Sequence, residues 1–509
     1  MALRKKTLAG VLLASAAVLL AGVAAQGQGL PPISGRDVTN ALEPVTIPDD
    51  LQAKLSVLPK EKLDIIKSGR ASRYVRPERM FAKLRTISGP QMIAYIDAIL
   101  SVTDAGEYKA GRDKPTISLN TKSPQFNAWK AQRPQTMNPK REAGPLELGK
   151  YIGGFGGGGG GGIPTFANAP PALTYADLVA GKVDVAIVGA PLDMGSGWRD
   201  ALHGPVLLRA TGGAGGNDMY SMINPNSELK IVDFGDIAMD NLSTERSVHH
   251  VREVVRDIAK TGAIPIVIGG DHSLEYPNLA GITDVHGKGN VGVVHFDSHY
   301  DIGRDRPHLI DHGQPVYRVI SEGHVPGKNY VQVGLRARGP DAKTFQWMRD
   351  QGMRYHTMVD VERRGWDAVM KDAVAEARVS AKKLWISFDI DVLDPAFMPA
   401  TGTPVPGGLT MREAQPIMRR LCAENDIAGI DIVEYAPYLD TSYKTALNTN
   451  FLLNACLSGI AMRKKGLTQE HYLSPISSMD RPAATAPPPP PPPKTPPPKA
   501  LPAAKGARR

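Results

Sequence analysis

Short apolar runs alternate with longer segments of helical periodicity between residues 163 and 470. The apolar, β-branched runs have the length of single strands, and they span 183–188, 229–232, 264–268, 291–296, 330–333, 384–388 and 427–433. Because these runs are apolar on both faces, we expect strands buried on both sides, as in a parallel sheet covered by helices. Segment 247–261 has the spacing of a crossover helix. The pattern predicts an α/β domain, a three-layer sandwich in which helices flank a mostly parallel β-sheet.

The chain outside this domain has a different composition. Residues 26–150 are a polar, proline-punctuated N-terminal extension that we expect to be partly helical, with helical spacing over 88–102. Residues 151–162 are a glycine-rich linker; a phosphate-binding loop is the alternative, but no Lys-Ser or Lys-Thr pair follows the glycines. Residues 480–509 are rich in proline and should form an extended, disordered tail.

Residues 1–25 have the three parts of a secretory signal peptide. Arg4, Lys5 and Lys6 precede a continuous stretch of small or apolar residues over 8–21, and residues 22–25 offer small side chains for cleavage. We therefore expect an exported protein, periplasmic or secreted, with no stable membrane insertion after cleavage. An uncleaved membrane anchor is the alternative.

The net charge of +9 would suggest a nucleic-acid partner if it lay on the folded domain. The first 25 residues carry three of these positive charges, and residues 480–509 carry an excess of five. Only about one positive charge is left for the rest of the chain. The charge therefore belongs to the chain ends, and nucleic acid is not an expected partner. The composition, 42% hydrophobic and 22% charged, is ordinary for a soluble globular protein.

Cys422 and Cys456 are the two cysteines of the chain, which excludes a disulfide scaffold. Both lie in stretches of helical or core-facing character, so we expect buried free thiols. One disulfide is the alternative if the compartment is oxidising.

Three of the predicted strands end in carboxylates and histidines. The endings are Gly-Gly-Asp-His-Ser at 269–273, Asp-Ser-His-Tyr-Asp at 297–301 and Ser-Phe-Asp-Ile-Asp-Val-Leu-Asp-Pro at 387–395. Carboxyl ends of parallel strands meet at one edge of a sheet, and residues two apart on a strand point to one side. Four aspartates in one dry site would raise one another's pKa, and two divalent cations would neutralise them. The sequence therefore predicts a two-metal hydrolase with the candidate ligands His272, Asp297, His299, Asp301, Asp389 and Asp391. We expect His295, inside the strand before Asp297, to point to the opposite face as a buried or supporting histidine.

These segments resemble the metal motifs of the arginase/agmatinase (ureohydrolase) family. Stretches at 162–166, 188–193, 204–205, 232–236 and 434–440 extend the resemblance over about residues 160–465. The resemblance implies an arginase-like fold, two Mn²⁺ ions per chain and a homo-oligomer. It implies that one ion is bound by His272, Asp297, Asp301 and Asp389, and the second by Asp297, His299, Asp389 and Asp391. A hydroxide bridging the two ions, oriented by Asp301, would attack a guanidinium carbon and release urea and an amine.

The same resemblance assigns roles outside the metal motifs. Glu434 matches the family carboxylate that pairs with the guanidinium group. His312, in Asp-His-Gly-Gln-Pro at 311–315, matches the loop histidine that transfers protons. His308, in the loop before it, is a further candidate for substrate binding. The candidate catalytic residues are thus His312, Glu434 and Asp301, and the candidate substrate-binding residues are Glu434, His312 and His308.

Two departures from the family pattern concern the substrate. Arginases have an asparagine two residues after the last aspartate of the second motif and a serine four residues before the loop histidine. This chain has Gly303 and His308 there, which disfavours free arginine and is closer to agmatinases. The expected substrate is a small linear guanidino compound such as agmatine or a guanidino acid. The closest alternative is a formimino-compound hydrolase with the same metal motifs, and a non-catalytic exported binding protein is a further one.

Overall fold

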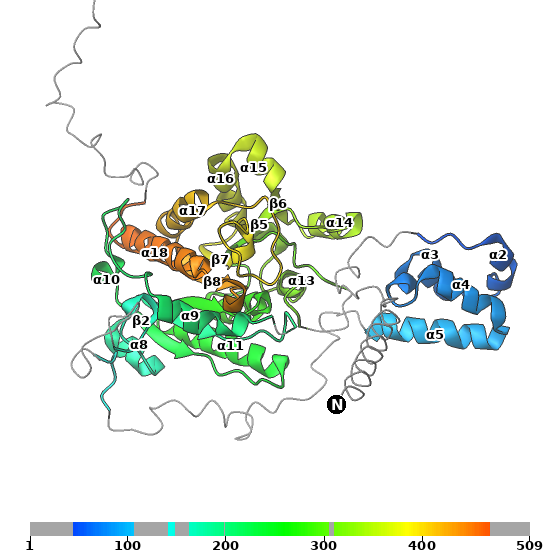
Figure 1. The fold of residues 1–509 in the computed structure, drawn as a ribbon, viewed down its shortest axis with the longest axis horizontal. Helices are drawn as coiled ribbons and strands as arrows, with labels where there is room; N and C mark the ends of the chain where they lie inside the picture. The colour runs from blue at the N-terminus through cyan, green and yellow to red at the C-terminus, as the bar shows by residue number, and fades with distance from the viewer. Residues whose placement is uncertain (1–43, 106–140, 148–161, 198, 305–309, 469–509) are drawn as a thin grey trace, which may run out of the picture.

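The computed structural model describes residues 44–105, 141–147, 162–197, 199–304 and 310–468 (Figure 1). The predicted signal peptide, the glycine-rich linker up to residue 161, the proline-rich tail and His308 lie outside the described residues. The predictions made for them stay predictions.

Within the described residues, eight strands form one sheet in which every pairing is parallel. The order across the sheet is β2-β1-β3-β8-β7-β4-β5-β6. The strands are β1 (Val185–Ala190), β2 (Ile231–Asp236), β3 (Ile264–Gly269), β4 (Val291–Phe296), β5 (Tyr330–Leu335), β6 (Arg354–Thr357), β7 (Lys383–Asp389) and β8 (Ile427–Val433). The predicted parallel sheet is confirmed, and each of the seven predicted strands coincides with one of these strands to within a few residues.

The apolar pattern missed β6, whose sequence is Arg-Tyr-His-Thr. This strand lies at the edge of the sheet and pairs with β5 alone. Of its residues only His356 is buried. An edge strand is partly open to solvent and needs no continuous apolar run, so hydrophobicity alone does not reveal it.

Helices cover both faces of the sheet and make it the middle of three layers (Figure 1). Successive strand residues point to opposite faces: Val185 and Ile187 of β1 join one core, and Ala186 and Val188 join the other. One core is closed by α9 (Gly204–Thr211), α15 (Met358–Arg364), α16 (Trp366–Ala377), α17 (Met411–Glu424) and α18 (Lys444–Lys464), and the short α10 (Pro225–Glu228) contacts α18. The other is closed by α8 (Tyr175–Gly181), α11 (Thr244–Lys260), α12 (Glu275–His286), α13 (Pro315–Ser321) and α14 (Ala342–Asp350). Helix α11 is the predicted crossover helix.

The N-terminal helices have a hydrophobic core of their own, which includes Leu51, Leu55, Ile66, Leu84 and Ile96. They are α2 (Asp49–Leu55), α3 (Lys60–Lys67), α4 (Pro77–Thr86) and α5 (Gly89–Ala105), with a short 3₁₀ turn over Arg70–Arg73. Helix α5 coincides with the helical spacing found at 88–102.

Residues 141–147 pack against the sheet domain, at α8 and the segment before it. Arg141 Nη2 donates to both carboxylate oxygens of Asp177 at 2.7 Å, and the main-chain N–H of Gly144 donates to one of them at 2.7 Å. The N–H of Leu146 donates to the carbonyl of Pro171 at 2.8 Å. Since Asp177 is fully buried, this segment closes over the start of α8.

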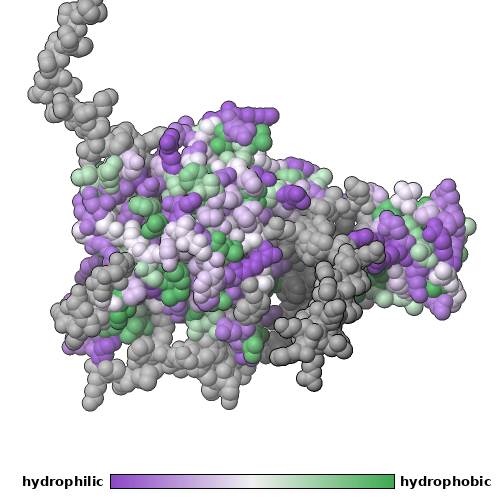
Figure 2. All heavy atoms as spheres, viewed as in Figure 1, coloured by the Kyte–Doolittle hydropathy of each residue, from purple (hydrophilic) through white to green (hydrophobic). Residues whose placement is uncertain are grey.

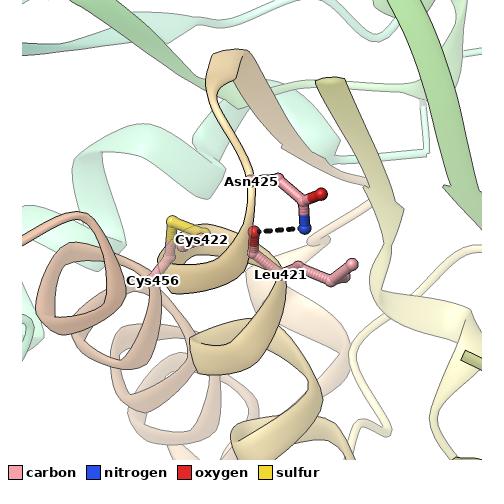
Figure 3. Close-up of a disulfide and its surroundings, with 4 residues drawn as sticks. All are labelled: Leu421, Cys422, Asn425 and Cys456. Atoms are coloured by element: carbon pink, nitrogen blue, oxygen red, sulfur yellow. Dashed lines mark hydrogen bonds between the residues drawn. A yellow bond between two sulfur atoms is a disulfide. The ribbon is translucent and has the colours of Figure 1, made fainter. Parts of the chain in front are cut away.

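Cys422 and Cys456 form a disulfide that joins α17 to α18, with Cα atoms 5.3 Å apart (Figure 3). The expectation of free thiols is therefore wrong. The sequence alone could not predict that the two cysteines are close, because their distance depends on how α17 packs against α18. Next to the bond, α17 ends where Asn425 Nδ2 donates to the carbonyl of Leu421 at 2.9 Å.

No helix in the described part of the chain has the length and apolar character needed to cross a membrane. On the face shown in Figure 2, hydrophilic and hydrophobic residues are interspersed over the described parts of the surface.

Candidate metal centre and active site

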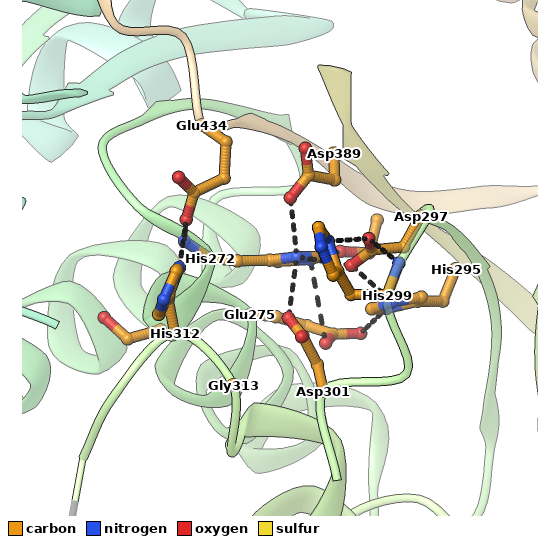
Figure 4. A network of polar contacts seen from close by, with 12 residues as sticks. His272, Glu275, His295, Asp297, His299, Asp301, His312, Gly313, Asp389 and Glu434 are labelled. Atoms are coloured by element: carbon orange, nitrogen blue, oxygen red, sulfur yellow. Dashed lines mark hydrogen bonds and ion pairs between the residues drawn. The ribbon is translucent and has the colours of Figure 1, made fainter. Parts of the chain in front are cut away.

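The predicted metal ligands lie at the carboxyl ends of β3, β7 and β4, and the predicted substrate carboxylate Glu434 lies at the end of β8, which stands between β3 and β7 in the middle of the sheet (Figure 4). His272 follows β3, Asp297 follows β4, Asp389 ends β7 and Glu434 follows β8. Ligands of open α/β sheets bind at this edge because the loops leaving the strands converge there. The fold therefore brings together segments that are more than 100 residues apart in sequence.

His272 lies at the centre of the first group of ligands. Its Nδ1 atom is 3.0 Å from Asp297 Oδ2, 3.2 Å from Asp301 Oδ2 and 3.2 Å from Asp389 Oδ2. The ring is fully buried, and Nδ1 makes no well-aligned hydrogen bond with any described residue.

The second nitrogen of His272 has a partner that fixes the tautomer of the ring. Ser387 donates its hydroxyl hydrogen to Asp431 Oδ1 at 2.7 Å, so its oxygen is left to accept from His272 Nε2 at 2.9 Å. A neutral His272 then carries its hydrogen on Nε2 and directs the Nδ1 lone pair at three carboxylate oxygens. A divalent cation between these four atoms would satisfy all of them, so the residues fit a metal.

The second group consists of Asp297, His299 and Asp391, whose ligand atoms all lie within 4.8 Å of one another. His299 Nδ1 is 2.9 Å from Asp391 Oδ2 and 3.4 Å from Asp297 Oδ1. Thr403 Oγ1 donates to the same Asp391 oxygen at 3.2 Å. Imidazole and carboxylate donors suit manganese and neighbouring divalent metals, and Asp297 contributes one oxygen to each group.

The carboxylates of the two groups repel one another, and cations would remove this repulsion. Burial, together with the charges of Asp391 and Asp297, raises the pKa of Asp389 well above its ordinary value. Burial and the charge of Asp297 likewise raise the pKa of Asp301. Burial also acts to raise the pKa of Asp297, but contacts with three histidines outweigh it and hold this pKa well below its usual range. These carboxylates cannot all be ionised side by side without positive charge among them.

His295 does not point to the opposite face, so this expectation was wrong. Its Nε2 is 3.1 Å from Asp297 Oδ2, and its ring stacks on His272 with centroids 4.8 Å apart. The reason is the strand period of two, which places residues 295 and 297 on the same side. The other nitrogen, Nδ1, contacts Glu275 Oε1 at 3.2 Å and the Tyr330 hydroxyl at 2.9 Å. Since carboxylates occupy both its nitrogens, His295 supports Asp297 rather than coordinating a metal, although it lies close enough to the first group to be a ligand.

Glu434 and His312 form a pair beside the first group of ligands. Glu434 Oε1 is 3.0 Å from His312 Nδ1 and accepts the main-chain N–H of His272 at 2.8 Å. Burial lowers the pKa of His312, but the charge of Glu434 outweighs this effect and raises it to about 9. The main-chain N–H of His312 donates to the carbonyl of Gly195 at 3.1 Å, which holds its loop against the loop after β1.

Two of the candidate catalytic residues have a left-handed backbone. Asp301 has a φ of 46° and Glu434 a φ of 66°. Residues other than glycine adopt this conformation at a cost of roughly 1–3 kcal/mol, and such strained residues cluster at functional sites. The surrounding packing therefore holds both carboxylates in orientations that a relaxed backbone would not give them.

Sequence reasoning missed several buried groups that complete the site. Asp271 lies beside His272 in the first motif, where burial and the charge of Glu434 raise its pKa to about 7. Glu275 supports His295, and Asp431 accepts hydrogen bonds from Ser387 and from Trp385 Nε1. Each of these residues is charged and lies inside or next to an apolar run of the sequence. Such a position indicates a buried charged group with a specific partner, and this pattern could have identified them.

A parallel sheet whose central strands end in histidine and aspartate groups of this kind defines a hydrolase of the arginase type. The chain belongs to the Arginase family, which matches residues 183–458. It is 35% identical over 313 residues to a guanidinobutyrase of Pseudomonas aeruginosa, covering 59% of this chain and 94% of that protein. It is 35% identical over 292 residues to an agmatinase of Chromobacterium violaceum, covering 56% of this chain and 85% of that protein.

A solved structure shows the same fold. The crystal structure of a hypothetical agmatinase from Burkholderia thailandensis has a TM-score of 0.54 and 30% sequence identity, covering 61% of this chain and 95% of that one. The predicted family, fold and enzyme class, a hydrolase acting on C–N bonds of linear guanidines, are thereby confirmed.

Proposed function

We propose that this protein is an exported, binuclear manganese amidinohydrolase that cleaves a small linear guanidino compound to urea and an amine. The observation that carries the proposal is the convergence of three carboxylate oxygens on the Nδ1 lone pair of His272, next to the buried Glu434–His312 pair. Convergent oxygen and imidazole donors are suited to divalent metals, and a buried carboxylate is suited to a planar guanidinium.

One ion would be held by His272, Asp297, Asp301 and Asp389, and the other by Asp297, His299, Asp389 and Asp391. When bound, two divalent ions act as Lewis acids and make water acidic enough to be a nucleophile near neutral pH. Asp301, whose carboxylate lies 3.2 Å from His272 Nδ1, orients that nucleophile.

Glu434 is proposed to receive the guanidinium group of the substrate. The N–H of His272 holds one of its oxygens in place, and its burial leaves the negative charge poorly screened by water. Two N–H groups of a planar guanidinium can bind one carboxylate in parallel, which fixes the plane of the carbon under attack.

His312 is proposed to give a proton to the departing amine. Its Nδ1 is held by Glu434 at 3.0 Å, so Nε2 is the nitrogen left to face the substrate. Because the ring is anchored through both its side chain and its main-chain N–H, it needs no large rearrangement to reach the leaving group.

Agmatine and 4-guanidinobutyrate are the first substrates to test, because relatives at 35% identity are named agmatinase and guanidinobutyrase. Export is supported by the Cys422–Cys456 disulfide, since such bonds persist in oxidising compartments.

The test is to purify residues 26–509 with Mn²⁺ and to measure urea release and metal content across a panel of guanidino and formimino compounds. We expect two ions per chain and urea release from an agmatine-like or guanidino-acid substrate. Asp297→Ala and Asp389→Ala should abolish activity, whereas Asp284→Ala, which removes a surface partner of Arg252, should not. Fewer than two ions at saturating Mn²⁺ would contradict the metal centre, and hydrolysis of a formimino compound without urea would favour the alternative reaction.

A further inference from the structure

Arg336 follows β5 and lies behind the loops that carry the metal ligands. Its five N–H groups make six hydrogen-bond contacts of 2.7–3.3 Å, one N–H of Nη2 being shared between two acceptors, and all six acceptors are main-chain carbonyl oxygens. The acceptors belong to Gly334, Asp391, Val392, Leu393, Val405 and Pro406. An arginine that binds backbone in this way uses its rigid fork of donors to fix the course of a loop.

Three of these bonds act on the loop of one metal ligand. Arg336 Nη2 donates to the carbonyl of Asp391 at 2.7 Å, and the guanidinium also binds the next two carbonyls along the chain. The side chain of Asp391 is fixed from the other side, since its Oδ1 accepts the N–H of Ser298 at 3.0 Å.

The backbone of Arg336 holds the loop of two other ligands. Its N–H donates to the carbonyl of Ser298 at 3.0 Å, and the N–H of Ala337 donates to the same oxygen at 2.9 Å. Ser298 stands between Asp297 and His299. One residue therefore ties the loop of Asp297 and His299 to the loop of Asp391, the three residues that form the second group of ligands.

Two glycines allow this close arrangement. A Cβ on Gly408 would lie 2.5 Å from the carbonyl oxygen of Val392 and 2.6 Å from the N–H nitrogen of Asp394, inside the space used by the guanidinium. Gly334 has a φ of 104°, and a Cβ there would lie 2.5 Å from Val392 Cγ2 and 3.1 Å from the carbonyl oxygen of Asp297. No larger residue fits at either position without moving a metal-bearing loop.

We propose that Arg336 is a positioning residue of the metal centre, which sets the distance between Asp391 and the Asp297–His299 pair and so the affinity for the ion these three hold. The other ion also takes Asp297, but through Oδ2, which His295 Nε2 contacts, and it takes His272, whose loop is held separately by Glu434 and Ser387. The effect of Arg336 should therefore be larger on the ion held with Asp391 and His299 than on the other. The inference rests on the proposed metal centre but not on the identity of the substrate.

The test titrates metal-free full-length protein with Mn²⁺ and follows binding by calorimetry and electron paramagnetic resonance. Arg336→Lys keeps the charge but loses the fork, and it should weaken binding of one of the two Mn²⁺ ions by about 10–100-fold, as outer partners of metal ligands do, and binding of the other much less. The matched control is Arg209→Lys, which alters a partly buried arginine that binds Asp233 and Asp236 at the sheet edge. It should leave both Mn²⁺ affinities at their wild-type values.

Two further measurements separate positioning from a general loss of structure. In an Asp391→Ala background, Arg336→Lys should have little additional effect on the remaining ion, because both changes act on the same site. Saturating Mn²⁺ should restore the kcat of Arg336→Lys towards wild type with KM unchanged. If Arg336→Lys does not fold, Arg336→Gln, which keeps a planar amide donor but not the fork, takes its place.

Unchanged Mn²⁺ affinities in a folded Arg336→Lys protein would overturn the proposal, and so would equal weakening of both ions. Both of these results concern only the Arg336→Lys variant. The wild-type protein could still release urea, so neither result would contradict the proposed function. Conversely, a wild-type protein that binds two Mn²⁺ ions but hydrolyses no guanidine would refute the function and leave the role of Arg336 standing.

Discussion

Loss of the Cys422–Cys456 disulfide should destabilise the catalytic domain, and the number of residues in the loop that the bond closes determines by how much. The bond closes a loop with a sequence separation of 34. In the chain-entropy description, a closed loop of that length lowers the entropy of the unfolded chain by roughly 13 cal/mol/K, which is about 4 kcal/mol at 25 °C. The two cysteines are buried between α17 and α18, and a domain of this size should lose roughly 2 °C in Tm for each kcal/mol.

The assay compares oxidised and reduced wild-type protein, because reduction removes the cross-link without changing the packed side chains. Both forms are metal-saturated and unfolded in urea under the same conditions. Cys422→Ala/Cys456→Ala serves as the control, and its stability should not respond to the reductant. Before reduction, the denatured protein should show no titratable thiol.

Two results would refute this reasoning in different ways. Two free thiols in the unreduced, denatured protein would show that the bond does not form and would remove its support for export. A bond that is present but changes the free energy of unfolding by less than about 1 kcal/mol would show that loop entropy is not its main effect. The predicted difference is large enough to separate these outcomes.

Three further predictions concern the packing and the site. Gly459→Ala should destabilise the protein by about 1–3 kcal/mol at the contact between α17 and α18. The added Cβ would lie 2.8 Å from Cys422 Cβ and 3.0 Å from the N–H nitrogen of Ala423. An unchanged midpoint of urea unfolding would contradict this prediction. Asp389→Ala should lower urea release at least about 1000-fold, or about 4 kcal/mol of transition-state stabilisation, with Mn²⁺ content below two per chain; activity near wild type would exclude Asp389 as a shared ligand. In protein without bound metal, the pKa of His312 is about 9 in the folded state and about 6.5 in the unfolded state. The pair with Glu434 therefore stabilises the folded protein fully below pH 6.5, and this stabilisation is lost as pH rises through 9. The free-energy gap between wild type and His312→Gln, measured by urea unfolding, should therefore narrow over that range, and a gap that widens would contradict the pairing.

The sequence was sufficient for features that depend on local pattern. Continuous apolar runs located seven of the eight strands in the described residues, because strands in the interior of a parallel sheet must be apolar on both faces. Strand β6 was missed because it lies at the edge. The metal motifs could be grouped before the fold was known, since carboxyl ends of parallel strands share one edge of the sheet.

Features that depend on three-dimensional proximity could not be predicted in the same way. Nothing in the sequence around Cys422 and Cys456 states that α17 and α18 pack side by side. The role of Arg336 is equally hidden, because its partners are carbonyl groups that every residue has. His295 is a different case: the strand period would have placed it beside Asp297 had it been applied consistently.

The charge of the site gives a reason why its substrate should be a cation. Among the described residues, eight buried or partly buried carboxylates lie in or next to the candidate metal centre: Asp271, Glu275, Asp297, Asp301, Asp389, Asp391, Asp431 and Glu434. Two divalent ions would neutralise four of these charges. His295, held between Glu275 and Asp297, and His312, beside Glu434, would neutralise two more when protonated. Glu434 is then the buried carboxylate beside the candidate centre that can attract a guanidinium strongly and an uncharged urea far less. The proposed two-metal site and the proposed cationic substrate therefore rest on the same group of carboxylates.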